Sequence, residues 1–400
     1  MPLTMMENDM NWPVKIIPPG EKVIGIKWSR WFFCFLCILL ALVLSWGWMK
    51  LIAPAEEGEL LKLFALLFFL GLLAFFVIIP VRIYYYGLCL SVFEARERED
   101  ALAIKEWTKW ASQKFYVSAY KLFLPSVISP TDIALSHFVE IYNGQQLKLH
   151  GHNNSVYTEE QLIYELLASV RARLLRLQES CVFDVIFTYG SSYITFSTFK
   201  ECWAAIGFND DCLRSCYHWN EILEQEFDTL SNIAVNRASI IISANIECVE
   251  RYCSDSTEFA SILLVTHQEQ LPEKDNNGVA LRTMACNKNR TKQEFIHMMT
   301  YQPDVLKTTK VLFSNVSIED ALDVSEILRS SSLSMNIEWE YEVKHLSLML
   351  GKLAEVHYWL VFVLALFISE KNNESVLMVA SVGDDYVFNV IEPFDNNKEH

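Results

Sequence analysis

Two long apolar runs near the N-terminus dominate the hydropathy pattern of this chain. They extend from Trp31 to Met49 and from Leu61 to Ile79, and Lys62 is the only charged residue within them. An α-helix rises about 1.5 Å per residue, so roughly 20 apolar residues cross a hydrocarbon core ~30 Å thick. The pattern therefore predicts two transmembrane helices with a short turn, within residues 28–86. A pair of buried core helices is the alternative. The absence of any charge from the centre of both runs favours transmembrane helices over this alternative.

The charges beside the two runs predict their orientation. Cations flank the outer end of each run, whereas the intervening segment 53–59 holds three glutamates and no cation. Because cations concentrate on the cytoplasmic side, both termini are expected in the cytoplasm and the turn in the periplasm of a bacterial inner membrane. Residues 1–27 then form a cytosolic arm, and the charged, helix-favouring residues 87–115 form a stalk.

Beyond the stalk, residues 116–400 have the pattern of a cytosolic α/β domain. Short apolar runs alternate with amphipathic stretches, which is typical of strands that alternate with helices. The run from Tyr358 to Ile368 is too short to cross a bilayer, so we expect a buried core helix there. Strands are expected at 116–124, 137–142, 146–149, 182–189, 238–244, 260–266, 310–314, 375–380 and 386–391, and helices at 158–177, 198–206, 213–230, 317–328 and 343–367.

Composition limits which classes of partner and which metal ions or cofactors the chain is expected to bind. The net charge of −16 disfavours nucleic acid, since that partner is held by neutralising its phosphates. No internal repeat of short period is visible. Among ten cysteines, Cys212 and Cys216 with Cys248 and Cys253 have the ligands for a zinc site, in which His218 is a substitute ligand. Their spacing differs from that of a zinc knuckle, and small buried thiols are the alternative. We therefore predict no metal and no cofactor.

Catalytic motifs are scarce. The segment 190–192, Gly-Ser-Ser, follows an expected strand where a nucleophile elbow lies in other enzymes, but it lacks the Gly-x-Ser-x-Gly pattern and favours a turn. His267 and Glu269 are a candidate acid–base pair or a solvated surface pair. The remaining candidates are three acidic residues of one expected helix, the first two explained by capping of its first turn, and two histidines better explained as core or edge residues. They are Asp320, Asp323, Glu326, His345 and His357. No catalytic or cofactor-binding residue is assigned.

The C-terminal third resembles the last part of a thiolase-fold chain, as in ketosynthases. Lys344 and Gly351 match the positions of a Lys and a Gly in that pattern, and Ser375 to Ile391 resembles its closing hairpin. The resemblance implies a thiolase-like fold. It also implies a pseudoenzyme, because Lys352 stands where a His follows the Gly, residues 314–316 lack a His-Gly-Thr, and no cysteine lies in a nucleophile elbow.

The layout of anchor and α/β domain is similar to that of proteins encoded with bacterial type VI secretion systems. Together these patterns predict a membrane-anchored, non-catalytic interaction protein, an adaptor or immunity factor, with the lipid bilayer and a protein as partners. Two alternatives stay open. One is a membrane-tethered enzyme acting on acyl or lipid substrates, and the other is a ligand sensor coupled to the membrane hairpin.

The predicted topology is testable with reporter fusions. A reporter active only in the periplasm should give signal when inserted at Gly58 and none when fused after His400, because cations flank the outer helix ends and glutamates fill the turn. Signal from the fusion after His400 would overturn the predicted orientation.

Overall fold

The computed structural model describes residues 12, 23–52, 57–135, 139–150, 157–189, 192–219, 224–246, 255–271, 278–354 and 357–394. The chain divides into two compact units. One consists of Lys15–Glu106, and the other combines Met1–Val14 with Trp107–His400. Each unit is described by itself below, and the second is called the globular unit.

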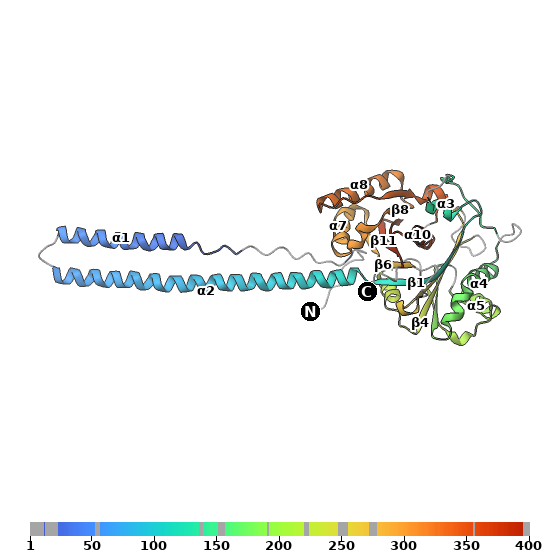
Figure 1. Ribbon diagram of the computed structural model, residues 1–400, viewed down its shortest axis with the longest axis horizontal. Coiled ribbons are helices and arrows are strands. Elements are labelled where there is room, and N and C mark those ends of the chain that lie inside the picture. Colours follow the sequence, from blue (N-terminus) through green and yellow to red (C-terminus); the bar gives the residue numbers. More distant parts are fainter. Residues whose placement is uncertain are drawn as a thin grey trace. The chain divides into compact units, whose positions relative to one another are not determined.

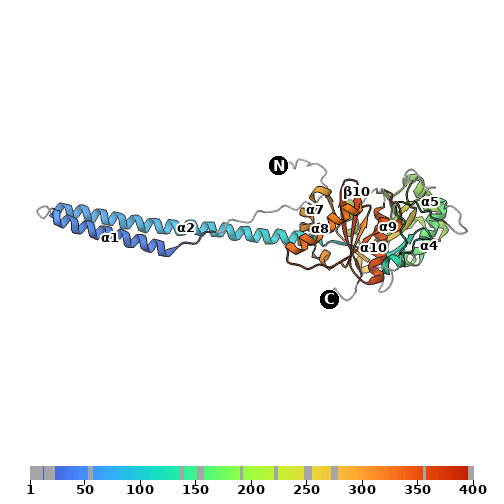
Figure 2. The ribbon, with the colours of Figure 1, turned by 90° about the horizontal axis from the view of Figure 1, so that it is seen from above.

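The first unit consists of two long helices, α1 (Trp28–Ile52) and most of α2 (Glu57–Ala111). Within the described residues, both are long and apolar enough to cross a membrane, and their apolar windows are not buried. They lie side by side (Figures 1 and 2), and Phe75 of α2 contacts Trp31 and Phe35 of α1 at ring-centroid distances of 6.4 and 5.1 Å. The two predicted apolar helices are thus confirmed, while their orientation in a membrane stays a prediction.

The stalk predicted at 87–115 is helical over most of its length. Its residues continue α2 without a break as far as Ala111, and β1 begins at Lys114. The charged composition of this stretch is compatible with a helix, so nothing interrupts the helix after its apolar part.

One mixed sheet organises the described part of the globular unit. Its strands follow the order β3-β2-β4-β5-β1-β6-β11-β10-β8-β9, and β7 pairs with β11. The bounds are β1 Lys114–Phe123, β2 Val182–Phe187, β3 Leu213–His218, β4 Arg237–Asn245, β5 Phe259–Thr266, β6 Gly278–Leu281, β7 Met284–Asn287, β8 Lys310–Ser314, β9 Glu342–His345, β10 Val376–Val382 and β11 Asp385–Pro393. The fold class is therefore α/β, as predicted.

The same strand topology occurs twice. In the first half (114–266), β2 lies parallel to β3 and β4, β4 is antiparallel to β5, and β5 is antiparallel to β1. In the second half (278–393), β8 lies parallel to β9 and β10, β10 is antiparallel to β11, and β11 is antiparallel to β6. The two halves join where β1 and β6 pair antiparallel. The two halves repeat the strand topology, and no short-period sequence repeat predicted this.

Helices cover both faces of the sheet. On the outer face, α4 and α5 cover the first half and α7 and α8 cover the second, whereas α6 and α10 pack on the inner face (Figure 1). The helix bounds are α3 Pro130–Leu135, α4 Glu159–Leu177, α5 Ser192–Ala205, α6 Glu224–Ser231, α7 Thr291–Tyr301, α8 Ile318–Ser334, α9 Leu346–Leu350 and α10 Tyr358–Asn372.

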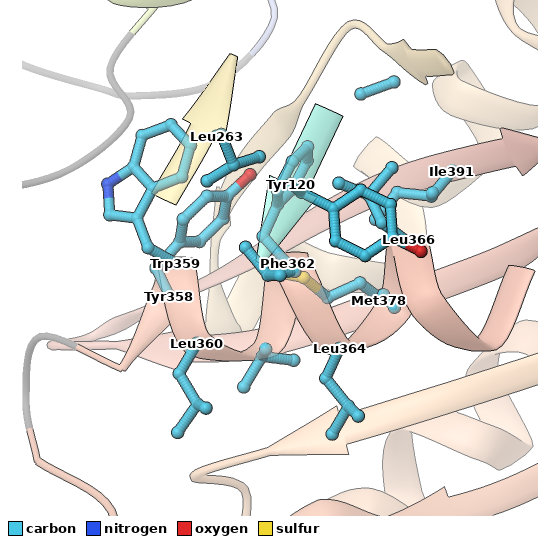
Figure 3. Close-up of a cluster of buried hydrophobic side chains, with 14 of the residues drawn as sticks. Tyr120, Leu263, Tyr358, Trp359, Leu360, Phe362, Leu364, Leu366, Met378 and Ile391 are labelled. Carbon is cyan, nitrogen blue, oxygen red and sulfur yellow. The ribbon is translucent and has the colours of Figure 1, made fainter. Parts of the chain in front are cut away.

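Helix α10 is the centre of the core. Its residues from Tyr358 to Leu366 are all buried, which explains why it is apolar on every side. Phe362 and Leu366 lie among Met378 and Ile391 of the second half and side chains of β1 and β5 (Figure 3). The predicted buried helix at 358–368 is therefore confirmed.

Local capping predictions also hold. Helix α4 begins with a capping box in which the Thr158 hydroxyl accepts from the amide of Gln161 and the Gln161 side chain accepts from the amide of Thr158. Helix α8 begins after Ser317, whose hydroxyl accepts from the amide of Asp320 at 3.0 Å. Side-chain-to-backbone bonds of this kind depend only on nearby residues, so the sequence reveals them.

Three predicted elements are wrong, and tertiary pairing explains each. Residues 213–218 form strand β3 beside β2 instead of the start of a helix, and residues 342–345 form strand β9 beside β8. The hairpin predicted around Gly144 is absent from the described residues 139–149. That segment keeps the turn but bonds to other parts of the chain: the amide of Tyr142 donates to Leu348 O. Strands β6 and β7 and helix α7 were not predicted.

The central position of α10 predicts a large cost for trimming it. Replacing the fully buried Leu364 with alanine should lower the free energy of unfolding by about 2–5 kcal/mol, because it leaves a cavity in a closed core. Replacing Leu322, which is 64% exposed on α8, should change it by less than about 0.5 kcal/mol. Urea unfolding of the full chain in detergent measures both, and equal effects would contradict the central role of α10.

Candidate functional site

The duplicated topology creates two places where strand order reverses. In the first half, the chain leaves β2 towards β3 and later leaves β4 towards β5, on the opposite side. In the second half, the same reversal separates β8 from β10. Ligands of α/β sheets bind at such switch points, outside the carboxyl ends of the strands. These two edges are therefore the candidate sites of this fold.

Buried polar side chains gather at the first edge. Asn245, the last residue of β4, donates from its amide to Ser256 Oγ at 3.0 Å and to Thr257 O at 2.9 Å. Glu258 precedes β5, and its carboxylate accepts from the amide of Leu149 at 2.8 Å. All four of these polar residues, Asn245, Ser256, Thr257 and Glu258, are buried.

An ammonium group balances the buried carboxylate. Lys148 Nζ lies 3.1 Å from Glu258 Oε1, and about a third of the lysine side chain is exposed. A buried carboxylate is costly unless it is paired and hydrogen-bonded, and Glu258 satisfies both conditions. The pair thus places two opposite charges, balanced by one another, at the edge of the sheet.

The second half reaches this edge through the segment that follows β9. The amide of Lys352 donates to Gln145 O at 2.8 Å, and the amide of Thr257 donates to Lys352 O at 2.6 Å. Gly351 has φ 80° and ψ −156°, a region open almost only to glycine, and a Cβ there would overlap Gln145 O and lie 2.8 Å from Thr257 Oγ1. We call this meeting of the halves the polar junction; it consists of Asn245, Ser256, Thr257, Glu258, Gly351 and Lys352.

The carboxyl end of β8 lies beside the same segment. Asn315 has φ 54°, and its amide donates to the hydroxyl of Ser347 in α9 at 2.9 Å. Ser314, just before it, is fully buried, and its hydroxyl has no hydrogen-bond partner among the described residues. Since nearly all buried hydroxyls are bonded, an unbonded one at a strand end marks a position for a ligand or water.

His345 and His357, predicted to be core or edge histidines, are half-buried and fully buried, respectively. His345 ends β9 and stacks on Phe313 at a centroid distance of 5.6 Å, and burial lowers its pKa. His357 precedes α10, is fully buried, and its Nδ1 lies 2.8 Å from Ala354 O. Both residues therefore flank the segment that forms the polar junction.

The other sequence candidates lie elsewhere. His267 caps a short turn, where its Nδ1 accepts from the amide of Glu269 at 3.3 Å, so this pair is a local cap. Asp320 and Asp323 are exposed near the start of α8, and Glu326 is exposed one turn further on. Gly190 and Ser191 lie outside the described residues, and Ser192 begins α5.

The predicted zinc ligands are only partly described. Cys212 lies in a short turn and Cys216 in β3, where burial raises the pKa of the Cys216 thiol. Cys216 therefore lies in a strand and not in the helix expected at 213–230. Cys248 and Cys253 lie outside the described residues. Among the residues that are described, no group of three or more His, Cys, Asp or Glu side chains is placed to hold a metal ion.

Sequence reasoning missed the polar junction. Asn245, Thr257 and Glu258 belong to no motif, and Gly351 attracted attention only through a family resemblance. The signal that was present is the polar stretch Ser256-Thr257-Glu258 directly before a wholly buried strand. Apart from Asn245, however, its partners are distant along the chain, and 109 positions separate Leu149 from Glu258.

Comparison with known proteins yields distant structural matches. No protein-family model matches the chain, and no curated protein matches it. Solved structures similar to it include AbyA1, titled a tetronic acid condensing enzyme (9% identity, 69% of this chain, 99% of that chain, TM-score 0.44). ChlB3, titled "Aceyltransferase", has 10% identity, covers 70% of this chain and 98% of its own, and has a TM-score of 0.44. Acetamide-bound OleA from Xanthomonas campestris has 9% identity, 70% and 99% coverage and a TM-score of 0.45.

These matches correct the function predicted from the sequence. The prediction of a non-catalytic adaptor or immunity factor of a secretion system is wrong by this comparison, in which similar structures are titled a tetronic acid condensing enzyme and an "Aceyltransferase". They offer no support for a link to type VI secretion or for a pseudoenzyme. At about one identical residue in ten, no residue role is carried over from them to this chain.

The backbone at the polar junction predicts a specific sensitivity. Gly351→Ala should lower the free energy of unfolding by about 1–3 kcal/mol more than Gly144→Ala, because the added Cβ overlaps neighbouring atoms only at position 351. Gly144 is the matched control, with φ 70° and open space around it. Denaturant unfolding of the full chain compares the two, and equal losses would show that Gly351 is not closely packed.

Proposed function

We propose that this chain is a membrane-tethered enzyme that acts on acyl or lipid substrates, with its site at the polar junction and the adjoining Ser314. The observation that carries the proposal is the meeting of the carboxyl edges of both halves on buried hydroxyl, amide and carboxylate groups. Keeping such groups away from water is costly, and sites of chemistry are where proteins accept that cost.

The class of substrate follows from the helices and the charge. Helices α1 and α2 expose long apolar surfaces that suit a bilayer, so acyl chains are the molecules nearest to a chain anchored by them. The net charge of −16 disfavours nucleic acid as a substrate. We place the chain in a bacterial inner membrane with both termini in the cytoplasm, on the distribution of cations given above.

Ser314 is the group that we expect to contact the substrate. Its hydroxyl is available as a hydrogen-bond donor. The side-chain amide of Asn245 is already bonded to Ser256, and the carboxylate of Glu258 is already bonded to the amide of Leu149. A single hydroxyl can orient an acyl carbonyl or a headgroup oxygen by one hydrogen bond. Helix α9 links this position to the polar junction, because Ser347 bonds to Asn315 and the helix ends at Leu350, directly before Gly351.

The test uses the purified full chain in detergent and in bilayer nanodiscs. Acyl-coenzyme A thioesters and phospholipids are supplied, and mass spectrometry follows their consumption. We expect one class to be consumed, and Ser314→Ala to lower kcat/KM by about tenfold, the equivalent of one lost hydrogen bond to the substrate.

Ser331→Ala is the matched control. Ser331 is also fully buried with a hydroxyl that has no partner among the described residues, but it lies in α8 on the outer face. This variant should retain wild-type activity. Consumption of neither substrate class, or equal losses in the two variants, would overturn the proposal.

A further inference from the structure

The last residue of β6 and the two residues that connect it to β7 are each held by a hydrogen bond to the carbonyl oxygen. Leu281 O accepts from the Asn389 amide at 2.8 Å, and Arg282 O accepts from the Gln302 amide at 3.1 Å. Thr283 O accepts from the indole of Trp12 at 3.0 Å. Each carbonyl therefore has a side-chain partner, and the segment is held in one place.

The side chain of Arg282 is a buried cation within this frame. It is 1% exposed, and its Nε donates to Trp110 O at 3.1 Å. Its Nη2 donates to the side chains of Gln113 and Asp228. The guanidinium lies over the rings of Trp110 and Phe227, with 4.0 and 4.9 Å to their centroids.

On one side of Arg282 is the last turn of α2. The final carbonyls of a helix have no partner within it, and a cation is favourable beside them. Here Trp110 O accepts from Arg282, and Ala111 O accepts from the Gln302 amide at 2.8 Å. The end of α2 is thus bonded into the interior of the globular unit.

On the other side of Arg282 are the inner helices. Asp228 and Phe227 both belong to α6. Phe227 contacts Phe115 of β1 at 5.6 Å, and Phe115 stacks on Phe362 of α10 at 5.7 Å. A continuous series of contacts therefore leads from α2 through Arg282 to α6 and α10, the helix that follows the polar junction.

We infer that Arg282 couples the last turn of α2 to the inner helices, so that the site and the membrane-anchored helix influence each other. A buried guanidinium cannot lose its partners on one side without leaving polar groups unpaired in the core. A shift of α6 is therefore transmitted to α2, and by linkage a shift of α2 is transmitted to α6. The inference rests on the proposed function only for the identity of the ligand at the site.

The coupling is measurable without any ligand. Hydrogen exchange is followed by mass spectrometry in the full chain in detergent, with Asp228→Ala as the main variant. This change removes the α6 partner of Arg282. The sequence of α2 and the side chains of Arg282 and Gln302 that bond to its last turn are unchanged. We expect exchange of the amides at 108–113 to rise by about tenfold, because the loss of one charged hydrogen bond favours local opening.

Two further variants make the result decisive. Lys292→Met removes an exposed cation of α7 and should leave exchange at 108–113 unchanged. Arg282→Lys keeps the charge but not the planar fork, and it should raise exchange at both 108–113 and 224–231. If Asp228→Ala raises exchange everywhere, including α8, the variant is globally destabilised. Exchange at 108–113 in Arg282→Lys is then used to judge the inference.

The inference is wrong if the deciding variant changes exchange in α6 alone and leaves 108–113 as in the wild type. Its failure is distinguishable from failure of the proposed function, since it is read from exchange and not from turnover. A chain with no acyl or lipid activity can still show the coupling, and an active chain can lack it.

Discussion

The burial of α10 against both halves of the sheet is the constraint on which the rest of the globular unit depends. A helix that is apolar on every side must be covered on every side, and a single flat sheet covers only one. Two halves with one inner face solve this problem, because strands of both supply side chains to the same core. The outer helices are then free to be amphipathic, as the polar outer face of α4 shows.

The same arrangement explains where the polar junction lies. Topological duplication brings each half to the core with its own switch point, and the segment after β9 carries the second half to the edge of the first. The halves differ at this place. Two residues, Gly383 and Asp384, join β10 to β11, whereas the connection from β4 to β5 is longer and includes Ser256, Thr257 and Glu258. The proposed site therefore includes the β4–β5 connection, which is longer than the corresponding β10–β11 connection of the second half.

The sequence predicted what depends on nearby residues. The N-terminal caps of α4 and α8, the apolar helices α1 and α10 and most of the central strands follow from propensity and periodicity. What it could not predict depends on distant pairing. Residues 213–218 read equally well as helix or strand until β2 lies beside them, and β6 is only four residues long. The join of the halves pairs Lys114 with Leu281, two positions that no local pattern connects.

The candidate site was missed for a related reason. Its residues are ordinary polar types that become unusual only through burial, and burial is a property of the fold. Ser314 and Ser331 illustrate this, since both are fully buried serines and only one stands at the carboxyl end of a strand. A motif search cannot separate two such positions, but topology can, because it assigns switch points to one edge of a sheet.

Arg282 presents the opposite case, in which the chemistry of one residue exceeds what packing needs. An apolar side chain of similar volume would fill the space between Trp110 and Phe227, and replacing buried ions by apolar groups is often neutral or stabilising. The guanidinium does what an apolar group cannot, because it bonds at once to the end of α2 and to α6. Directional bonds to two helices fix their relative position, whereas apolar contacts allow them to slide. We therefore interpret the main role of the buried Arg282 as connecting α2 to α6, and its contribution to stability as secondary.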